Sequence, residues 1–170
     1  EEEIELEEIE ELSSGDEEED APRTTPEPAV EDDDEEGWSL DPDSIEAIDE
    51  GAFDDAVATL KKDPTDLETL GVVKRELIRR RDWDELVEKM GHSVKYLRRK
   101  DGEFEVMLEL AMILWKEVGD LDKAEYYFKR LRHNDSEMEE VLDFYEEYLE
   151  SKEQWRKLHL HLVGRLQHIS

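Results

Sequence analysis

The sequence predicts an all-α domain in which antiparallel helix pairs stack one on the next as a solenoid, preceded by a disordered acidic tail. Apolar residues recur at three- and four-residue spacing over most of the chain, and no alternating run typical of a strand occurs. The first 43 positions hold 22 of the 52 acidic residues. A chain of 170 residues has room for one modest core beside such a tail.

The predicted tail covers residues 1–40. Residues 1–43 contain one basic residue, Arg23, and four of the five prolines. Acidic runs at 17–20 and 31–36 cannot bury enough apolar surface to offset the entropy lost on ordering, so we expect disorder. Four aliphatic residues interrupt the first acidic run and predict a short protein-binding motif: Ile4, Leu6, Ile9 and Leu12.

The helical domain is expected to span residues 41–170. Trp38 directly precedes it and should either cap the exposed end of the array or contact a partner. Helix starts are indicated by the pair Asp41-Pro42 and by capping sequences that begin at Thr65, Asp82, Ser136 and Ser151. These signals divide the domain into four units, at about 44–62, 65–100, 103–133 and 136–168.

The units form an internal repeat. Its anchors are Phe53, Trp83, Leu121 and Trp155, at spacings of 30, 38 and 34 residues, and the longest step implies an extended turn. Trp83, Trp115 and Trp155 are expected in the core, since each lies on the apolar stripe. One helix pair cannot cover its own apolar face, so neighbouring units must stack.

The C-terminal end is predicted to be open. Leu160, Val163 and Ile169 remain after the internal core is filled, with few charges to solvate them. Together with a first residue that is Glu1 and not Met, this predicts that further repeats follow Ser170 in a longer protein, or that this end mediates self-association.

One segment resembles a known family. The sequence from Gly119 to Phe128, Gly-Asp-Leu-Asp-Lys-Ala-Glu-Tyr-Tyr-Phe, is similar to the turn and second helix of a tetratricopeptide repeat (TPR). Leu110-Ala111 resembles the Leu-Gly/Ala pair of the first helix, and Asp63-Pro64-Thr65-Asp66 resembles the linker between repeats. The resemblance covers roughly 44–168. It implies a right-handed superhelix of helix pairs, whose concave groove binds protein segments and performs no catalysis.

In that family the first helix of each pair lines the groove. The resemblance therefore assigns partner binding to seven residues, Arg75, Arg79, Ile113, Lys116, Glu140, Asp143 and Glu147. One end of this set is basic and the other acidic, which predicts an extended peptide bound in one direction. The alternative interpretation is a solvated polar face, as on any amphipathic helix.

Other classes of function find no support in the sequence. His159 and His161 lie about 200° apart on a helix, so no metal site is predicted, and no cofactor is implied. No glycine-rich phosphate loop and no pairing of a nucleophile with a base indicate an enzyme. The chain has no cysteine for disulfides or thiolate zinc sites, and no apolar run near the roughly 20 residues of a membrane helix.

The net charge of −30 repels nucleic acid and anionic lipid and favours basic protein partners. No signal peptide is visible, and a cytoplasmic location is expected, with the nucleus as the alternative. The predicted function is a non-catalytic scaffold or adaptor for protein–protein interaction. The alternative is an acidic chaperone or nucleic-acid mimic, in which the tail shields a basic protein.

Overall fold

The computed structural model describes residue 38 and residues 40–169. The compact unit that contains them begins at Trp38, three residues before the boundary expected from the sequence. The motif residues Ile4, Leu6, Ile9 and Leu12 lie outside the described residues, as does nearly all of the predicted tail.

The described part of the chain is all-α and contains no strand, which confirms the all-α class predicted from the sequence. A short 3₁₀ turn, η1 (Pro42–Ser44), is followed by α1 (Glu50–Lys62), α2 (Leu67–Arg80), α3 (Trp83–Tyr96), α4 (Glu103–Ile113), the π-helical turn η2 (Leu114–Val118), α5 (Leu121–Asn134), α6 (Glu139–Ser151) and α7 (Trp155–Ile169). Within these residues no helix is long and apolar enough to cross a membrane.

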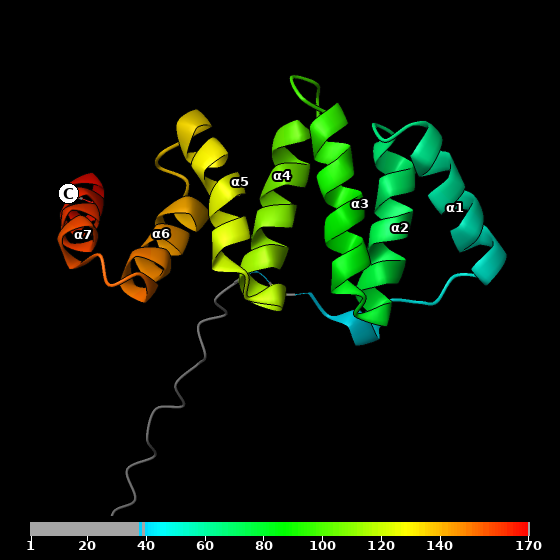
Figure 1. Ribbon diagram of the computed structural model, residues 1–170, viewed down its shortest axis with the longest axis horizontal. Helices are drawn as coiled ribbons and strands as arrows, with labels where there is room; N and C mark the ends of the chain where they lie inside the picture. Colours follow the sequence, from blue (N-terminus) through cyan, green and yellow to red (C-terminus); the bar gives the residue numbers. More distant parts are fainter. Residues whose placement is uncertain (1–37, 39, 170) are drawn as a thin grey trace, which may run out of the picture. The chain divides into compact units, whose positions relative to one another are not determined.

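Each helix packs against the helices that precede and follow it in the sequence (Figure 1). Connections alternate in length: two or three residues join the helices of each predicted pair, and four to six residues join one pair to the next. The 38-residue step has two sources, a six-residue connection at 97–102 and the continuation of α4 into η2. The extended turn expected there explains only part of the extra length.

Two helix starts agree with the sequence signals. Asp82 caps α3, since its carboxylate accepts from the backbone N–H of Glu85 at 3.2 Å. Asp41 caps η1 with Pro42 at the first position.

The other three predicted caps are wrong. Asp66 and not Thr65 caps α2, because its carboxylate accepts from two backbone N–H groups, while the Thr65 hydroxyl donates to Asp63 at 2.7 Å. Helix α6 begins after Met138 with no side-chain cap. Ser151 ends α6, and its hydroxyl donates to the carbonyl of Tyr148 at 2.8 Å.

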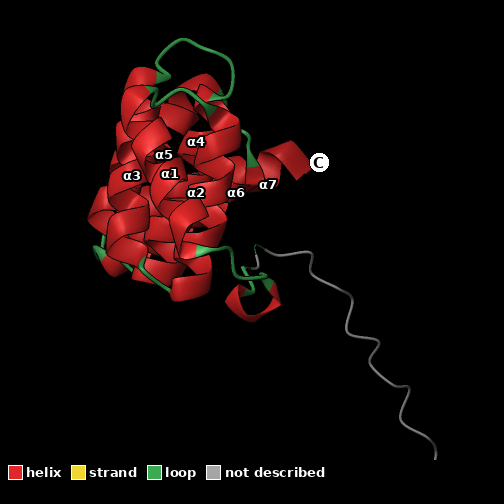
Figure 2. Ribbon diagram, turned by 90° about the vertical axis from the view of Figure 1, so that its right-hand side faces the viewer, coloured by secondary structure: helices red, strands yellow, loops and turns green. Residues whose placement is uncertain are grey.

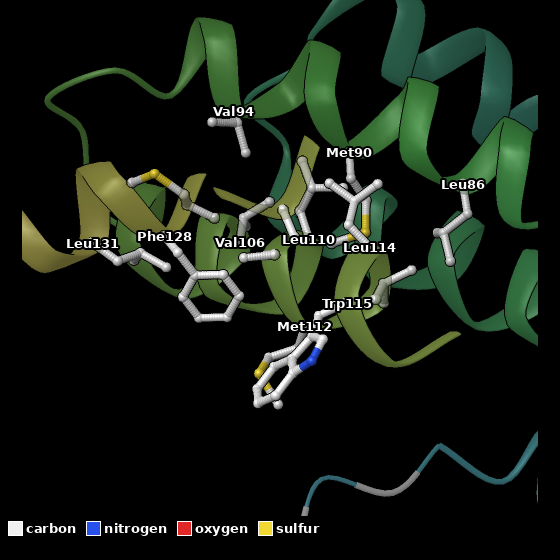
Figure 3. Close-up of a cluster of buried hydrophobic side chains, with 14 of the residues drawn as sticks. Leu86, Met90, Val94, Val106, Leu110, Met112, Leu114, Trp115, Phe128 and Leu131 are labelled. Atoms are coloured by element: carbon white, nitrogen blue, oxygen red, sulfur yellow. The ribbon is translucent and has the colours of Figure 1, made fainter. Parts of the chain in front are cut away.

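The core runs through the array and is most aromatic between α4, α5 and α6. The rings of Phe128 and Phe144 are stacked with centroids 4.1 Å apart, and Trp115 meets both edge-on at 5.8 and 5.5 Å. Figure 3 shows Phe128 and Trp115 beside the apolar residues of α3 and α4. Trp115 is only 7% exposed, so its predicted place in the core is confirmed.

The repeat anchors differ in their surroundings. Phe53 is buried, while Trp83 and Leu121 are half-buried and pack against the core. Trp155 is 58% exposed, so its predicted core position is wrong. Within the described residues α7 packs mainly on α6, and the anchor at the start of α7 remains exposed.

Candidate functional site

The first helices of the predicted pairs, α2, α4 and α6, lie side by side and form the candidate binding face. Lys74 on α2 donates to Glu109 on α4, with the ammonium nitrogen 2.6 Å from the carboxylate oxygen. Trp115, which follows α4 in η2, donates its indole N–H to Glu147 on α6 at 2.9 Å. The seven predicted groove residues are divided among these elements: two on α2 (Arg75 and Arg79), one at the end of α4 (Ile113), one in η2 (Lys116) and three on α6 (Glu140, Asp143 and Glu147).

The basic end of this face is built around a carboxylate that the sequence analysis missed. Glu76 on α2 is 1% exposed and accepts from Arg79 through two nitrogens, at 2.6 and 3.0 Å. It also accepts from Arg80 at 2.7 Å and from the backbone N–H of Ile48 at 3.4 Å. The charge of Arg79 is thus largely satisfied within the chain, whereas Arg75 remains exposed.

The ionisation of Glu76 follows from these donors. Hydrogen bonds from Arg79 lower the pKa of Glu76 from 4.5 to about 2, against the opposing effect of burial, and those from Arg80 and Ile48 act in the same direction. The carboxylate is therefore charged at any physiological pH. Through the hydrogen bond from Ile48, the carboxylate joins α2 to the segment that precedes α1.

That preceding segment lies against α2. Asp43 pairs with Arg81 at 3.2 Å, and η1 contacts α2. In the view along the row of helices, η1 lies at their lower end, on the side where α2 and α6 are labelled (Figure 2). Four apolar side chains of the segment pack against the core: Trp38, Leu40, Ile45 and Ile48. We call the described residues of this segment, 38 and 40–48, the strap.

The surroundings of Trp38 in the strap are relevant to its predicted role as a cap or a partner contact. Its side chain is half-buried, and its indole N–H is buried with no hydrogen-bond acceptor in the described part of the chain. Trp38 therefore packs against the core of its own chain, within a segment that is held on α2 by Asp43 and Ile48.

One predicted groove residue is wrongly assigned. Ile113 is 1% exposed and belongs to the core. Helix α4 is apolar on nearly all sides, as a helix enclosed by neighbours must be, and Met112 is buried as well. In Figure 3 Met112 and Trp115 point toward the side of the helices along which the strap runs. Residue 113 therefore lies on no solvent-exposed side of α4 and cannot contact a partner there.

Lys116 is exposed at the junction of α4 and α6. Its ammonium lies 3.3 Å from the centre of the Trp115 ring, whose N–H is bound to Glu147. Two of the predicted residues, Lys116 and Glu147, thus meet through one tryptophan. This local cluster of a cation, an aromatic ring and a carboxylate offers both charges to a ligand.

The acidic end of the candidate binding face, on α6, is partly neutralised by a basic residue of α7. Arg165 contacts Asp143 at 2.6 Å and Glu146 at 3.2 Å. The hydrogen bond to Asp143 raises the pKa of Arg165 above its usual value despite partial burial. Glu140 is half-exposed on the same helix. The predicted division into a basic and an acidic end is therefore weaker than the sequence implied, because partners within the chain use several of the charges.

A hollow lies between α1 and α3, away from these residues. It is a cavity of about 400 Å³ lined by Val57, Leu60, Lys61, Glu88, Lys89, Gly91, His92 and Lys95. Helical periodicity alone does not reveal that α1 and α3 bring Lys61, Lys89 and Lys95 together. Its lining suits a small anionic group.

Among the described residues no cluster of three or more His, Cys, Asp or Glu side chains gathers where it could hold a metal ion. Comparison with protein-family models, with curated proteins and with solved structures finds no match for this chain.

Proposed function

We propose that this protein is a non-catalytic interaction scaffold of tetratricopeptide-like solenoid architecture, which binds an extended segment of a partner protein on the face of α2, α4 and α6. The observation that carries the proposal is the strap. An irregular segment with spaced apolar residues already lies against α2, held by core packing, one backbone hydrogen bond and one ion pair. A partner segment would use the same kinds of contact.

The strap also has a defect that a partner could avoid. The buried indole N–H of Trp38 has no acceptor in the described part of the chain, and such a group costs about 1–3 kcal/mol. The Asp43–Arg81 pair is exposed, with 85% and 60% of the two side chains accessible, and so adds little affinity. The strap is therefore a ligand of modest strength that a better segment can displace.

The test uses the full chain with the strap loosened by Trp38→Ala and Ile45→Ala. A synthetic peptide of residues 38–49 is titrated into the loosened and the native chain by calorimetry. We expect at least tenfold tighter binding to the loosened chain, because the native face is occupied. The control peptide has Ser at Trp38, Leu40, Ile45 and Ile48 and should not bind.

A charge exchange locates the site. Adding Arg81→Asp to the loosened chain replaces the weak ion pair by a repulsion between two carboxylates, which should weaken the native peptide, and a peptide with Asp43→Arg should regain part of the loss. Equal affinity of the native and control peptides, or a loss that the exchanged peptide does not recover, would contradict a segment-binding face on α2.

A further inference from the structure

The side of α7 that faces away from α6 is exposed and apolar. Helix α7 ends the row of helices in the described part of the chain (Figure 1). It carries four of the eight large apolar side chains that are exposed on the described surface: Trp155 at 58%, Leu160 at 63%, Val163 at 39% and Leu166 at 66%. Large apolar side chains gathered in this way mark a surface that is normally covered.

Helix α5 is the counterpart of α7 in the preceding pair. Both helices begin at a repeat anchor, Leu121 in α5 and Trp155 in α7, so their positions can be matched by counting from these residues. Three buried residues of α5 then correspond to three half-buried residues of α7: Ala124, Phe128 and Leu131 on α5, and Leu158, Leu162 and Arg165 on α7. The two helices therefore turn the same side inward, and the outer side of α7 corresponds to the side of α5 that carries the next helix.

On α5 that side is covered by α6 through polar and aromatic contacts. Asp122, the second residue of α5, pairs with Lys152 at the end of α6 at 2.7 Å. Glu125, the fifth residue, accepts a hydrogen bond from the Tyr145 hydroxyl at 3.3 Å. The guanidinium of Arg132, the twelfth residue, lies 4.8 Å from the centre of the same ring. The second, fifth and twelfth positions therefore face the helix that follows.

The matching positions of α7 have a different chemistry. The second residue is Arg156 instead of an aspartate, the fifth is His159 instead of a glutamate, and the twelfth is Leu166 instead of an arginine. Arg156 pairs with no carboxylate in the described part of the chain, and α7 contains no acidic residue. A helix that covers this side would therefore place a carboxylate where α6 places a lysine, and apolar side chains where α6 meets an arginine.

We propose that α7 binds an acidic amphipathic helix of a partner protein, in the place that α6 takes on α5. The surface is the α7 outer face, which we define as Trp155, Arg156, His159, Val163 and Leu166. Apolar residues of the partner helix cover its apolar side chains, and a carboxylate of the partner pairs with its arginine. This binding is independent of the segment binding proposed for α2, α4 and α6.

A second copy of this chain is a poorer occupant. Two α7 outer faces in contact would bring two copies of Arg156 to one interface with no carboxylate from either helix. Helix α1, at the other end of the row, exposes Asp54 and Asp55 but no large apolar side chain. An acidic amphipathic helix supplies both the charge and the apolar surface.

The probe is a synthetic peptide of residues 136–152 with the change Lys152→Glu, which puts a carboxylate at the place of the lysine that pairs with α5. The peptide of native sequence is its matched control. Each is titrated into the isotope-enriched full chain, and the indole N–H signals of the four tryptophans are followed by NMR. We expect the Trp155 signal to shift, and the changed peptide to bind at least threefold more tightly than the native one. The signal of Trp115, which is bound to Glu147 on α6, should stay in place.

A charge exchange on the chain locates the contact. Arg156→Asp should reverse the order of the two peptides, because the lysine of the native peptide then meets a carboxylate. The control is Lys157→Asp, the same change at the next residue. Its counterpart on α5 is Lys123, which pairs with Asp120 in front of its own helix and not with α6. The control should lower both affinities alike and leave their order unchanged.

The comparison of the two peptides on the native chain keeps the test decisive if Arg156→Asp fails to fold. Equal affinity of the two peptides, or no binding of either, would overturn the proposal. A shift of the Trp115 signal without one of Trp155 would mean that the peptide replaces α6 within the chain, and would also overturn it. So would sedimentation that shows the native chain self-associating through this face, with the association lost in Arg156→Asp, since the occupant would then be a second copy.

Discussion

Replacing Glu76 with glutamine tests whether this buried carboxylate anchors the strap and the end of α2. The change keeps the size of the side chain and removes its charge, so that three strong hydrogen bonds from Arg79 and Arg80 lose their ionic character. Hydrogen bonds to charged groups are worth more than neutral ones, and here one buried acceptor serves all of them.

The magnitude follows from the pKa. A lowering from 4.5 to about 2 corresponds to about 3 kcal/mol of stabilisation at neutral pH, at about 1.4 kcal/mol for each tenfold change in proton affinity. The arginines keep 33% and 29% of their side-chain exposure, so solvent screens part of the interaction. We expect Glu76→Gln to lower the free energy of unfolding by about 2 kcal/mol at pH 7.

The pH dependence has a definite sign. The pKa of Glu76 is lower in the folded than in the unfolded chain, so its contribution is complete above about pH 5.5. The contribution declines as the pH falls from about 5 toward 2, where the folded-state carboxylate takes up its proton. The difference between the native chain and Glu76→Gln should therefore shrink to less than half at pH 3.

The assay is urea denaturation followed by circular dichroism at pH 7 and pH 3. The control is Glu88→Gln on α3, an exposed glutamate, which should change the unfolding free energy by less than about 0.5 kcal/mol at either pH. A loss that is the same at both pH values, or no greater than that of the control at pH 7, would refute the reasoning.

Three further substitutions are expected to act through different causes. Trp115→Ala should cost about 3–5 kcal/mol in a denaturant titration, because it removes a buried indole that packs edge-on against two phenylalanine rings; a cost under about 1 kcal/mol would place the ring on the surface. Gly102→Ala should cost about 1–2 kcal/mol because φ there is +84°, and a new methyl would also meet Leu67, which can turn away; a neutral thermal melt would contradict this. Asp82→Ala should cost about 1 kcal/mol by removing the cap of α3, whereas Asp82→Asn should largely preserve it.

The helices themselves were predictable because packing imposes their period on the sequence. Apolar residues such as Leu86, Met90 and Val94 recur at helical spacing, and all three are buried on one side of α3. One of the cap errors arose where two polar residues stand next to one another and either could cap the helix. At the start of α2 the Asp66 carboxylate, which has two acceptor oxygens, caps the helix in place of the neighbouring Thr65 hydroxyl.

The site was less predictable because it depends on contacts between distant segments. Glu76 resembles dozens of other carboxylates, and the one local sign of its burial is a place on the apolar stripe between Val73 and Leu77, followed by arginines three and four residues later. Ile113 could have been recognised as core, since the surrounding run is apolar all round and leaves no polar face. Nothing local indicates that Ile48 would donate to α2.

The π-helical turn η2 has a consequence for protein engineering. It widens the last turn of the first helix of the third pair, between Leu114 and Val118, and Trp115 lies within it. Widened turns of this kind are rare and local, and a single residue added to or removed from one changes the phase of the helix by about 100°. A consensus repeat grafted in place of this pair would have a regular first helix, and the indole would then rotate away from Glu147. A chimera of this protein must therefore take its junctions outside 103–134, so that the irregular pair moves as one block.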